Sequence, residues 1–158
     1  DLKCGFHALS GHHTALYSST GDIFRNSCDQ ALRLFHQAGF PKEMLLMGAA
    51  FYSRKWENVK DRYHGFLQYT EKGGGYGPNY HELAEKYIDK NGYVSYWDDE
   101  AKAPFLFNGS TFISYDDERS LACKCRYVKE EGIGGIFYWC HSGDTSGVLL
   151  RKIGEEIR

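Results

Sequence analysis

Residues 112–144 constrain the fold more than any other segment, because they predict a strand, a helix and a second strand in close succession. Asp116 or Asp117 can cap the start of the helix by accepting from backbone N–H groups, and Gly132 stands where a helix ends in a left-handed residue. Residues 136–140 then form an unbroken apolar and aromatic run, which is typical of a parallel strand covered on both faces. This order of elements predicts an α/β fold.

Trp139 lies near the C-terminal end of that last strand, directly before a short loop at residues 141–144. In α/β folds, ligands bind at the loops that follow the C-terminal ends of the strands. A large aromatic ring at this place can form the floor of a site for a flat ligand. The alternative interpretation is a tryptophan that packs inside the core.

A helix and a strand are also predicted nearer the N-terminus, after a loop at residues 1–22. Ser27 and Gln30 suit a capping box for a helix that ends before Gly39. The apolar run at residues 44–52 favours a buried strand. The residues expected to form the apolar face of the helix are Ala31, Leu34, Phe35 and Ala38.

Tyr52 and Arg54 are expected at the end of this strand, two residues apart and therefore on the same face. An arginine offers several fixed hydrogen-bond donors and a tyrosine offers one, which suits a neutral ligand rich in hydroxyl groups. The alternative is a structural ion pair between Arg54 and either Glu57 or Asp61.

The segment between these two units reads as a small α+β insertion. Asn79 and Glu82 suit a capping box for a helix that runs to about Lys90. The dipeptide Asn108-Gly109 predicts a hairpin, and the glycine-rich residues 73–78 are expected to be flexible. The expected short strands are residues 93–97, 104–107 and 111–115.

Composition excludes several classes of function. The chain has 158 residues and a net charge of −2 with acids and bases mixed, so it offers no electrostatic case for nucleic acid or an anionic membrane. No apolar run approaches the ~20 residues that span a bilayer. The acidic residues 98–100 suit a charged turn better than a calcium loop, and the histidines show no metal pattern. The five cysteines are expected to be free thiols. We therefore expect neither a metal nor a cofactor.

Four segments, in order, resemble family 18 glycoside hydrolases, the chitinase family. Residues 112–144 resemble the last helix and eighth strand of the family's barrel. Residues 39–54, with Tyr52-Ser53-Arg54, resemble the lead into the seventh strand, which ends in Tyr-Gly-Arg in the family. Residues 98–107 resemble the approach to the end of its insertion domain, and residues 1–17 resemble the segment that begins at the end of its Met-x-Tyr-Asp signature.

The resemblance implies a partial (β/α)8 TIM barrel with a small α+β insertion domain. Residues 1–54 and 112–158 would form the C-terminal part of the barrel, and residues 55–111 the insertion. The family's catalytic signature, Asp-x-x-Asp-x-Asp-x-Glu, is absent from this sequence. We therefore expect the C-terminal half of an enzyme, in which the open sheet associates with itself or with the missing half.

The resemblance also implies the roles of individual residues. Trp139 would lie beneath the sugar at the cleavage point, while Tyr52 and Arg54 would contact sugar hydroxyls and the acetamido group. Ser53 replaces the family's usual glycine between them. Phe6 matches an aromatic residue on the product side.

Three further residues are weaker candidates. Asp1 corresponds to the aspartate of the Met-x-Tyr-Asp signature, which borders the cleavage subsite, and it is the one catalytic candidate in the chain. Tyr80 and Glu82 are candidates for the cleft from the side of the insertion. Glu82 suits a helix cap equally well.

The implied function is hydrolysis of β-1,4-linked N-acetylglucosamine polymers such as chitin by a secreted parent protein. In this family the acetamido oxygen of the substrate attacks the anomeric carbon while a glutamate protonates the leaving oxygen. That glutamate belongs to the absent signature, so we expect the chain alone to be inactive. The alternatives are a non-catalytic chitin- or glycan-binding lectin of the same fold, and an N-acetylglucosaminidase that acts on peptidoglycan or N-glycans.

Overall fold

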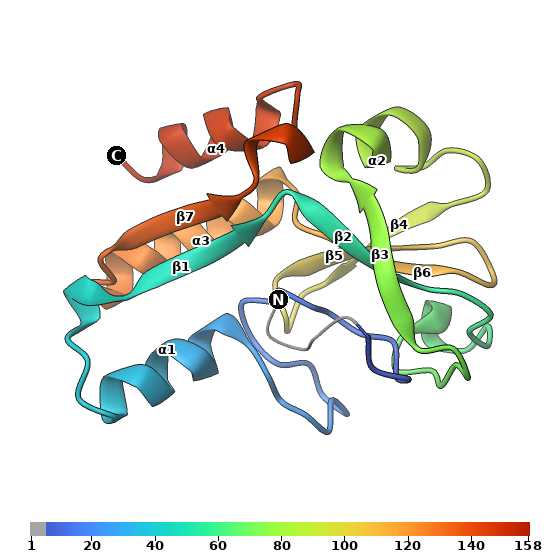
Figure 1. Ribbon diagram of the computed structural model, residues 1–158, viewed down its shortest axis with the longest axis horizontal. Coiled ribbons are helices and arrows are strands. Elements are labelled where there is room, and N and C mark those ends of the chain that lie inside the picture. Colours follow the sequence, from blue (N-terminus) through green and yellow to red (C-terminus); the bar gives the residue numbers. More distant parts are fainter. Residues whose placement is uncertain (1–5) are drawn as a thin grey trace.

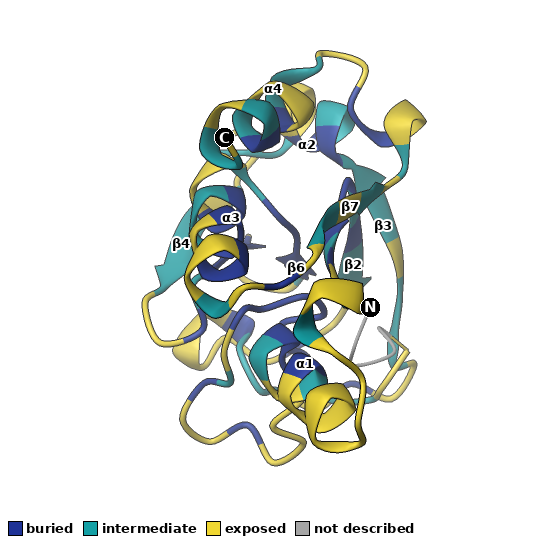
Figure 2. Ribbon diagram, turned by 90° about the vertical axis from the view of Figure 1, so that its left-hand side faces the viewer, coloured by how far each residue is buried: buried dark blue, intermediate teal, exposed yellow. Residues whose placement is uncertain are grey.

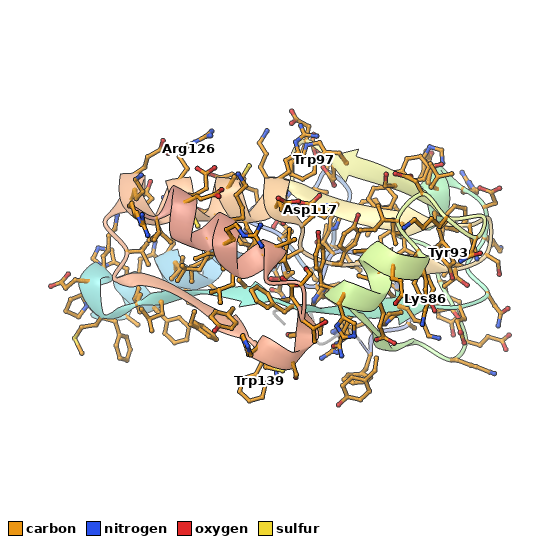
Figure 3. The ribbon with its side chains drawn as sticks, turned by 90° about the horizontal axis from the view of Figure 1, so that it is seen from above. Lys86, Tyr93, Trp97, Asp117, Arg126 and Trp139 are labelled. Atoms are coloured by element: carbon orange, nitrogen blue, oxygen red, sulfur yellow. The ribbon has the colours of Figure 1, made fainter. Side chains whose placement is uncertain are left out.

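The computed structural model describes residues 6–158, and its first layer is a pair of parallel strands with helices beside it. Strand β1 (Leu46–Ala50) pairs with β7 (Gly135–Trp139) in parallel, from Leu46 opposite Gly135 to Ala50 opposite Trp139. Helices α3 (Glu118–Glu131) and α4 (Val148–Glu156) pack together on one side of this pair (Figures 1 and 3). Helix α1 (Cys28–Gln37) precedes β1 and lies beside it (Figure 1).

The second layer is a five-stranded antiparallel sheet in the order β3-β2-β6-β5-β4. Helix α2 (Tyr80–Lys86) follows directly after β3. The hairpin predicted at Asn108 and Gly109 joins β5 to β6, and the Asn108 side chain accepts from the backbone N–H groups of residues 110 and 111. The strands are β2 (Tyr52–Trp56), β3 (Gly74–Asn79), β4 (Val94–Asp98), β5 (Ala103–Phe107) and β6 (Phe112–Ser114).

Three of the predicted helix ends are confirmed. The Ser27 hydroxyl accepts from the Gln30 backbone at the start of α1. Asp117 caps α3 by accepting from the Ser120 backbone, and Gly132 ends the helix at φ +67°. Each of these signals acts within one helical turn, so sequence alone carries it.

The predicted strand at residues 44–52 is in fact two strands. The chain leaves the parallel pair after Ala50, and β2 of the antiparallel sheet begins at Tyr52. Tyr52 and Arg54 therefore open a strand of the second sheet, and the prediction that they end the parallel strand is wrong. The sequence does not reveal this change of sheet, because the apolar run continues from β1 into the start of β2 and both strands have buried residues.

The glycine-rich segment expected to be flexible is also different in the structure. Most of it forms β3, which pairs with β2 from Trp56 opposite Gly74 to Tyr52 opposite Asn79. The following helix ends at Lys86 instead of Lys90. The five-stranded sheet spans residues 52–114, slightly wider than the insertion predicted at 55–111, and the domain division itself stays a prediction.

The prediction that residues 136–140 are buried on both faces is wrong for the described part of the chain. Phe137 is 48 % exposed and Trp139 is 67 % exposed, because the helices cover only the other face of β7. The apolar face predicted for α1 is likewise uncovered: Leu34 and Phe35 are exposed, while Cys28 and Leu32 are the buried residues of that helix. Figure 2 shows most of α1 as exposed.

One hydrophobic cluster joins the two layers. Phe51, between β1 and β2, packs in a cluster with Leu106 and Ile113 of the antiparallel sheet and with Leu121 and Leu149 of the helices. A shared core of this kind holds the two sheets in a fixed relation. The α/β fold class with a partial barrel and a small α+β insertion is thus confirmed.

A buried ion pair lies next to the C-terminal end of β1. The Lys124 ammonium and the Asp116 carboxylate are 2.6 Å apart, and both side chains are sealed from solvent. The Asp116 carboxylate also accepts from the Ala50 backbone N–H at 3.0 Å. The pair therefore ties α3 to the point where the chain passes from one sheet to the other.

Among the described residues, none of the helices has the length and apolarity that crossing a bilayer requires.

Candidate functional site

A hollow of about 500 Å³ lies where the end of β7 meets β2 and β3. It is shared by the two sheets, since Trp139 belongs to the parallel pair while Tyr52 and Arg54 belong to the antiparallel sheet. The structure therefore brings together the three residues singled out from the sequence. The lining residues are Tyr52, Ser53, Arg54, Tyr76, Gly77, Asn79, Trp139 and Cys140.

Trp139 offers an exposed indole ring to this hollow. Two thirds of the side chain is exposed, and Figure 3 shows the ring projecting away from α3 and α4. The peptide bond between Trp139 and Cys140 is cis. The alternative of a tryptophan packed in the core does not describe this residue.

Arg54 lies among three aromatic rings. Its guanidinium carbon is 4.7 Å from the ring centroid of Tyr52, 4.8 Å from that of Tyr76 and 5.4 Å from that of Phe6. Cations are attracted to ring faces within about 6 Å, so the rings orient the guanidinium. The alternative partner Glu57 pairs instead with Lys55, at 2.8 Å.

Tyr52 is a neutral donor at ordinary pH. Burial raises the pKa of its hydroxyl, and the nearby Arg54 charge only partly opposes this. Behind it lies the fully buried His13, whose ring centroid is 5.4 Å from that of Tyr52. Burial is the main cause that holds the pKa of His13 well below its usual value, and the charges of Lys124 and Arg54 are among the smaller ones, so this imidazole is neutral as well.

Tyr76 was missed by sequence reasoning. It stands in β3, opposite Arg54 in the strand register, and it is 75 % exposed. Gly77 lets this strand lie close to β2, since a Cβ at position 77 would collide with the Ser53 hydroxyl oxygen. An aromatic residue set between glycines was the one signal available in the sequence.

None of the remaining candidates is among the residues that line the hollow. Tyr80 is 7 % exposed and belongs to the core cluster, so the structure does not bring it to the hollow. Glu82 accepts from the Asn79 backbone N–H at 3.0 Å, which is the capping role. Phe6 touches Arg54 at the edge of the site, and Asp1 lies outside the described residues.

The chemistry of the described lining residues suits recognition of a neutral, polar ligand with an apolar face. They offer two exposed aromatic rings, a guanidinium, hydroxyl groups and an amide, and among them there is no carboxylate. General acid catalysis at a glycosidic bond needs a carboxyl group at the reacting oxygen. Hydrolysis at this hollow therefore needs an acid from outside the lining described.

Within residues 6–158, no group of three or more His, Cys, Asp and Glu side chains is arranged to hold a metal ion. In the acidic turn at residues 98–100, Asp98 makes structural contacts within the protein. Its carboxylate accepts from the Ser19 hydroxyl and lies 3.1 Å from the His12 imidazole. The four described cysteines are free thiols.

A second, apolar hollow of about 540 Å³ runs along α1 and the uncovered face of β1 and β7. Phe137 and Trp139 line it from β7, Leu46 from β1, and Leu32 and Phe35 from α1. Among the described residues, each strand of the parallel pair has one hydrogen-bonded neighbour, so each has one unpaired edge. This face is the open side of the partial barrel.

Comparison with known proteins gives a consistent result. Residues 4–144 match the family model described as glycosyl hydrolases family 18. Chitinase A1 of Niallia circulans is 38 % identical over an alignment of 128 residues that covers 76 % of this chain and 18 % of the relative. The chain thus spans about a fifth of the length of that relative.

Two solved structures share both fold and sequence. A family 18 N-acetylglucosaminidase from Paenibacillus barengoltzii superimposes with a TM-score of 0.95 at 51 % identity, covering 96 % of this chain and 45 % of its own. The cell-surface-expressed, multi-modular chitinase ChiW from Paenibacillus sp. str. FPU-7 gives a TM-score of 0.90 at 42 % identity, covering 99 % of this chain and 18 % of its own.

Proposed function

This chain belongs to glycosyl hydrolase family 18, and from that premise we propose that it is the C-terminal part of a chitinase-like enzyme. Its hollow binds polymers of β-1,4-linked N-acetylglucosamine such as chitin. The observation that carries this proposal is the convergence of Trp139, Tyr52 and Arg54, from two different sheets, on one hollow.

The side chains suit such a sugar in two ways. The exposed indole of Trp139 offers a broad apolar face on which the apolar face of a sugar ring can stack. Arg54 and Tyr52 supply polar N–H and O–H groups beside it for sugar hydroxyls and the acetamido group. The neutral state of Tyr52 keeps its hydroxyl proton available for donation.

We propose substrate-assisted, retaining hydrolysis for the intact protein. The acetamido oxygen of the substrate attacks the anomeric carbon, and the glutamate of the family's fourth-strand signature protonates the leaving oxygen. Asp1 is proposed to border the cleavage subsite. No such signature occurs in this chain, so residues 1–158 alone bind sugar without cleaving it. Release of reducing ends from chitin oligomers by the purified chain contradicts this.

A narrower activity is favoured by one comparison. The relative with 51 % identity is a family 18 N-acetylglucosaminidase, which supports release of N-acetylglucosamine as a second candidate beside chitin cleavage. The products of the intact protein on a chitin tetramer separate the two: single sugars indicate an N-acetylglucosaminidase, and dimers indicate a chitinase. Binding without any product indicates the lectin alternative.

The apolar hollow along α1 is the proposed docking face for the rest of the barrel. Its exposed Phe137 and Leu46, together with the unpaired strand edges, are features that adjoining parallel strands would cover. In the isolated chain, the same face is proposed to drive self-association. An extracellular location of the parent is supported by the cell-surface expression of its ChiW relative.

Calorimetric titration with N-acetylglucosamine oligomers tests the binding site. Trp139→Ala is expected to lower the affinity about 5- to 150-fold, since an exposed aromatic anchor of a binding site contributes about 1–3 kcal/mol. Trp97→Ala is the matched control, because Trp97 stacks on Arg119 and does not line the hollow. Equal affinity of the Trp139→Ala variant and the wild type would refute the site.

A further inference from the structure

The backbone of Trp139 is fixed by Phe51, the residue between β1 and β2. The N–H group of Phe51 donates to the Trp139 carbonyl at 2.8 Å, and the Phe51 carbonyl accepts from the N–H group of Tyr80 at 3.1 Å. Tyr80 is the first residue of α2, so the start of this helix is attached to the backbone that carries Trp139. The antiparallel layer and its helix therefore contact the end of β7 through Phe51.

A second connection between α2 and β7 runs through the short turn His141–Gly143 that follows the strand (Figure 1). Within this turn, the Gly143 N–H donates to the Cys140 carbonyl at 2.8 Å. The Gly143 carbonyl oxygen lies 3.0 Å from Nδ1 of His81, the second residue of α2. A carbonyl oxygen can only accept, so the imidazole donates from Nδ1.

These contacts form a closed circuit around the end of β7. Gly143 lies directly against Phe51, since a Cβ at position 143 would collide with the Phe51 carbonyl oxygen. The circuit runs from Trp139 to Phe51, along the start of α2, across to the turn and back to the strand. Three of its four hydrogen bonds join backbone groups, and His81 contributes the one side chain. This is therefore the link that a substitution can remove without changing the backbone path.

On the basis of the proposed function, we propose that His81 is a positioning residue for Trp139. By fixing the turn directly after β7, its imidazole restrains the backbone from which the exposed indole projects, so that the ring presents one face to the sugar. A side chain that is already ordered loses less conformational freedom when a ligand binds. His81 is not among the described residues that line the hollow, so it acts through Trp139 and does not touch the ligand.

Two substitutions separate the hydrogen bond from the bulk of the side chain. His81→Ala removes the donor, whereas His81→Asn keeps an N–H donor near the position of Nδ1. His36→Ala is the matched control, because His36 Nδ1 also lies 3.0 Å from a backbone carbonyl, that of Phe40, and His36 does not line the hollow. All variants are made in the protein at its natural length.

The first readout needs no sugar. The emission of Trp139, obtained as the difference from a Trp139→Phe protein, is followed by time-resolved anisotropy. His81→Ala is expected to increase the amplitude of fast indole motion, because the turn has lost a restraint, while His81→Asn and His36→Ala keep the wild-type value. Equal motion in His81→Ala and the wild type overturns the positioning role, and so does an equal increase in His81→Asn.

The second readout is the affinity for N-acetylglucosamine oligomers, measured by calorimetric titration. His81→Ala is expected to weaken binding about 2- to 10-fold, the net effect of one hydrogen bond, and to cause no further loss in a Trp139→Ala background. A loss of the same size with and without the indole means that His81 acts elsewhere, which overturns the inference. A wild-type protein that binds no sugar, while His81→Ala still loosens the indole, refutes the proposed function and supports the positioning of Trp139.

Discussion

Replacing Lys124 by methionine should strongly destabilise the fold. The Lys124 ammonium is completely buried, lies 2.6 Å from the Asp116 carboxylate and donates to the Thr14 hydroxyl at 2.8 Å. Methionine fills similar volume without the charge, so Lys124→Met leaves the Asp116 carboxylate buried without its counter-charge. Breaking a buried pair from one side in this way costs about 3–5 kcal/mol of unfolding free energy.

The remaining hydrogen bonds limit this loss. Asp116 still accepts from the Ala50 backbone N–H at 3.0 Å and from the Ser120 hydroxyl at 2.8 Å in the variant. For a chain of this length, each kcal/mol changes the melting temperature by about 2–4 °C, so the expected decrease is about 6–20 °C. Thermal and urea unfolding followed by circular dichroism measure it.

A second substitution separates charge from shape. Asn at position 116 can still accept from the Ala50 backbone but carries no charge, so Lys124→Met combined with Asp116→Asn should recover a large part of the lost stability. If Lys124→Met alone changes the unfolding free energy by less than about 1 kcal/mol, the pair does not have the energetic role assigned to it. The same conclusion follows if the double variant is less stable than Lys124→Met.

Three further outcomes are expected. Burial opposes ionisation of Asp98, but hydrogen bonds led by that from His12 outweigh it and hold the pKa of Asp98 well below its usual value. Its stabilising effect is therefore present above about pH 4, where the unfolded carboxyl ionises, and is lost as the pH falls further. The melting temperature of Asp98→Asn should accordingly be lower than wild type at pH 7 and converge with it in acid; parallel curves would contradict this. Gly77→Ala should destabilise the protein by about 1–3 kcal/mol through its collision with the Ser53 hydroxyl, and less in a Ser53→Gly background, as urea unfolding of the four proteins would show. Phe137→Lys should shift the isolated chain toward monomer in light scattering, because it places a charge on the uncovered face of β7; an unchanged mass distribution excludes that face as the contact.

Local signals predicted much of the secondary structure. The caps at Ser27 and Asp117 and the left-handed Gly132 all lie where expected, because a helix end is decided by a few neighbouring residues. The hairpin at Asn108-Gly109 follows from the same kind of local preference. These elements also set the order of strands and helices on which the family resemblance depends.

The candidate site was predicted in part. Trp139, Tyr52 and Arg54 were found from the sequence and do share one hollow. Tyr76 was missed because its strand is rich in glycine, and a strand of this kind has no local preference that would reveal it. Tyr80 was assigned to the cleft because sequence position alone does not show that it packs into the core cluster.

The amino-acid sequence by itself determined the family, both ends of α3, the start of α1 and the aromatic and basic residues available for sugar recognition. Only the tertiary structure decided which of these residues meet. The physical reason is that the pairing of β3 with β2, the change of sheet at Phe51 and the uncovered face of β7 depend on contacts between segments distant in the sequence. Tyr76 and Trp139 share a hollow because those long-range contacts fold two sheets against one core.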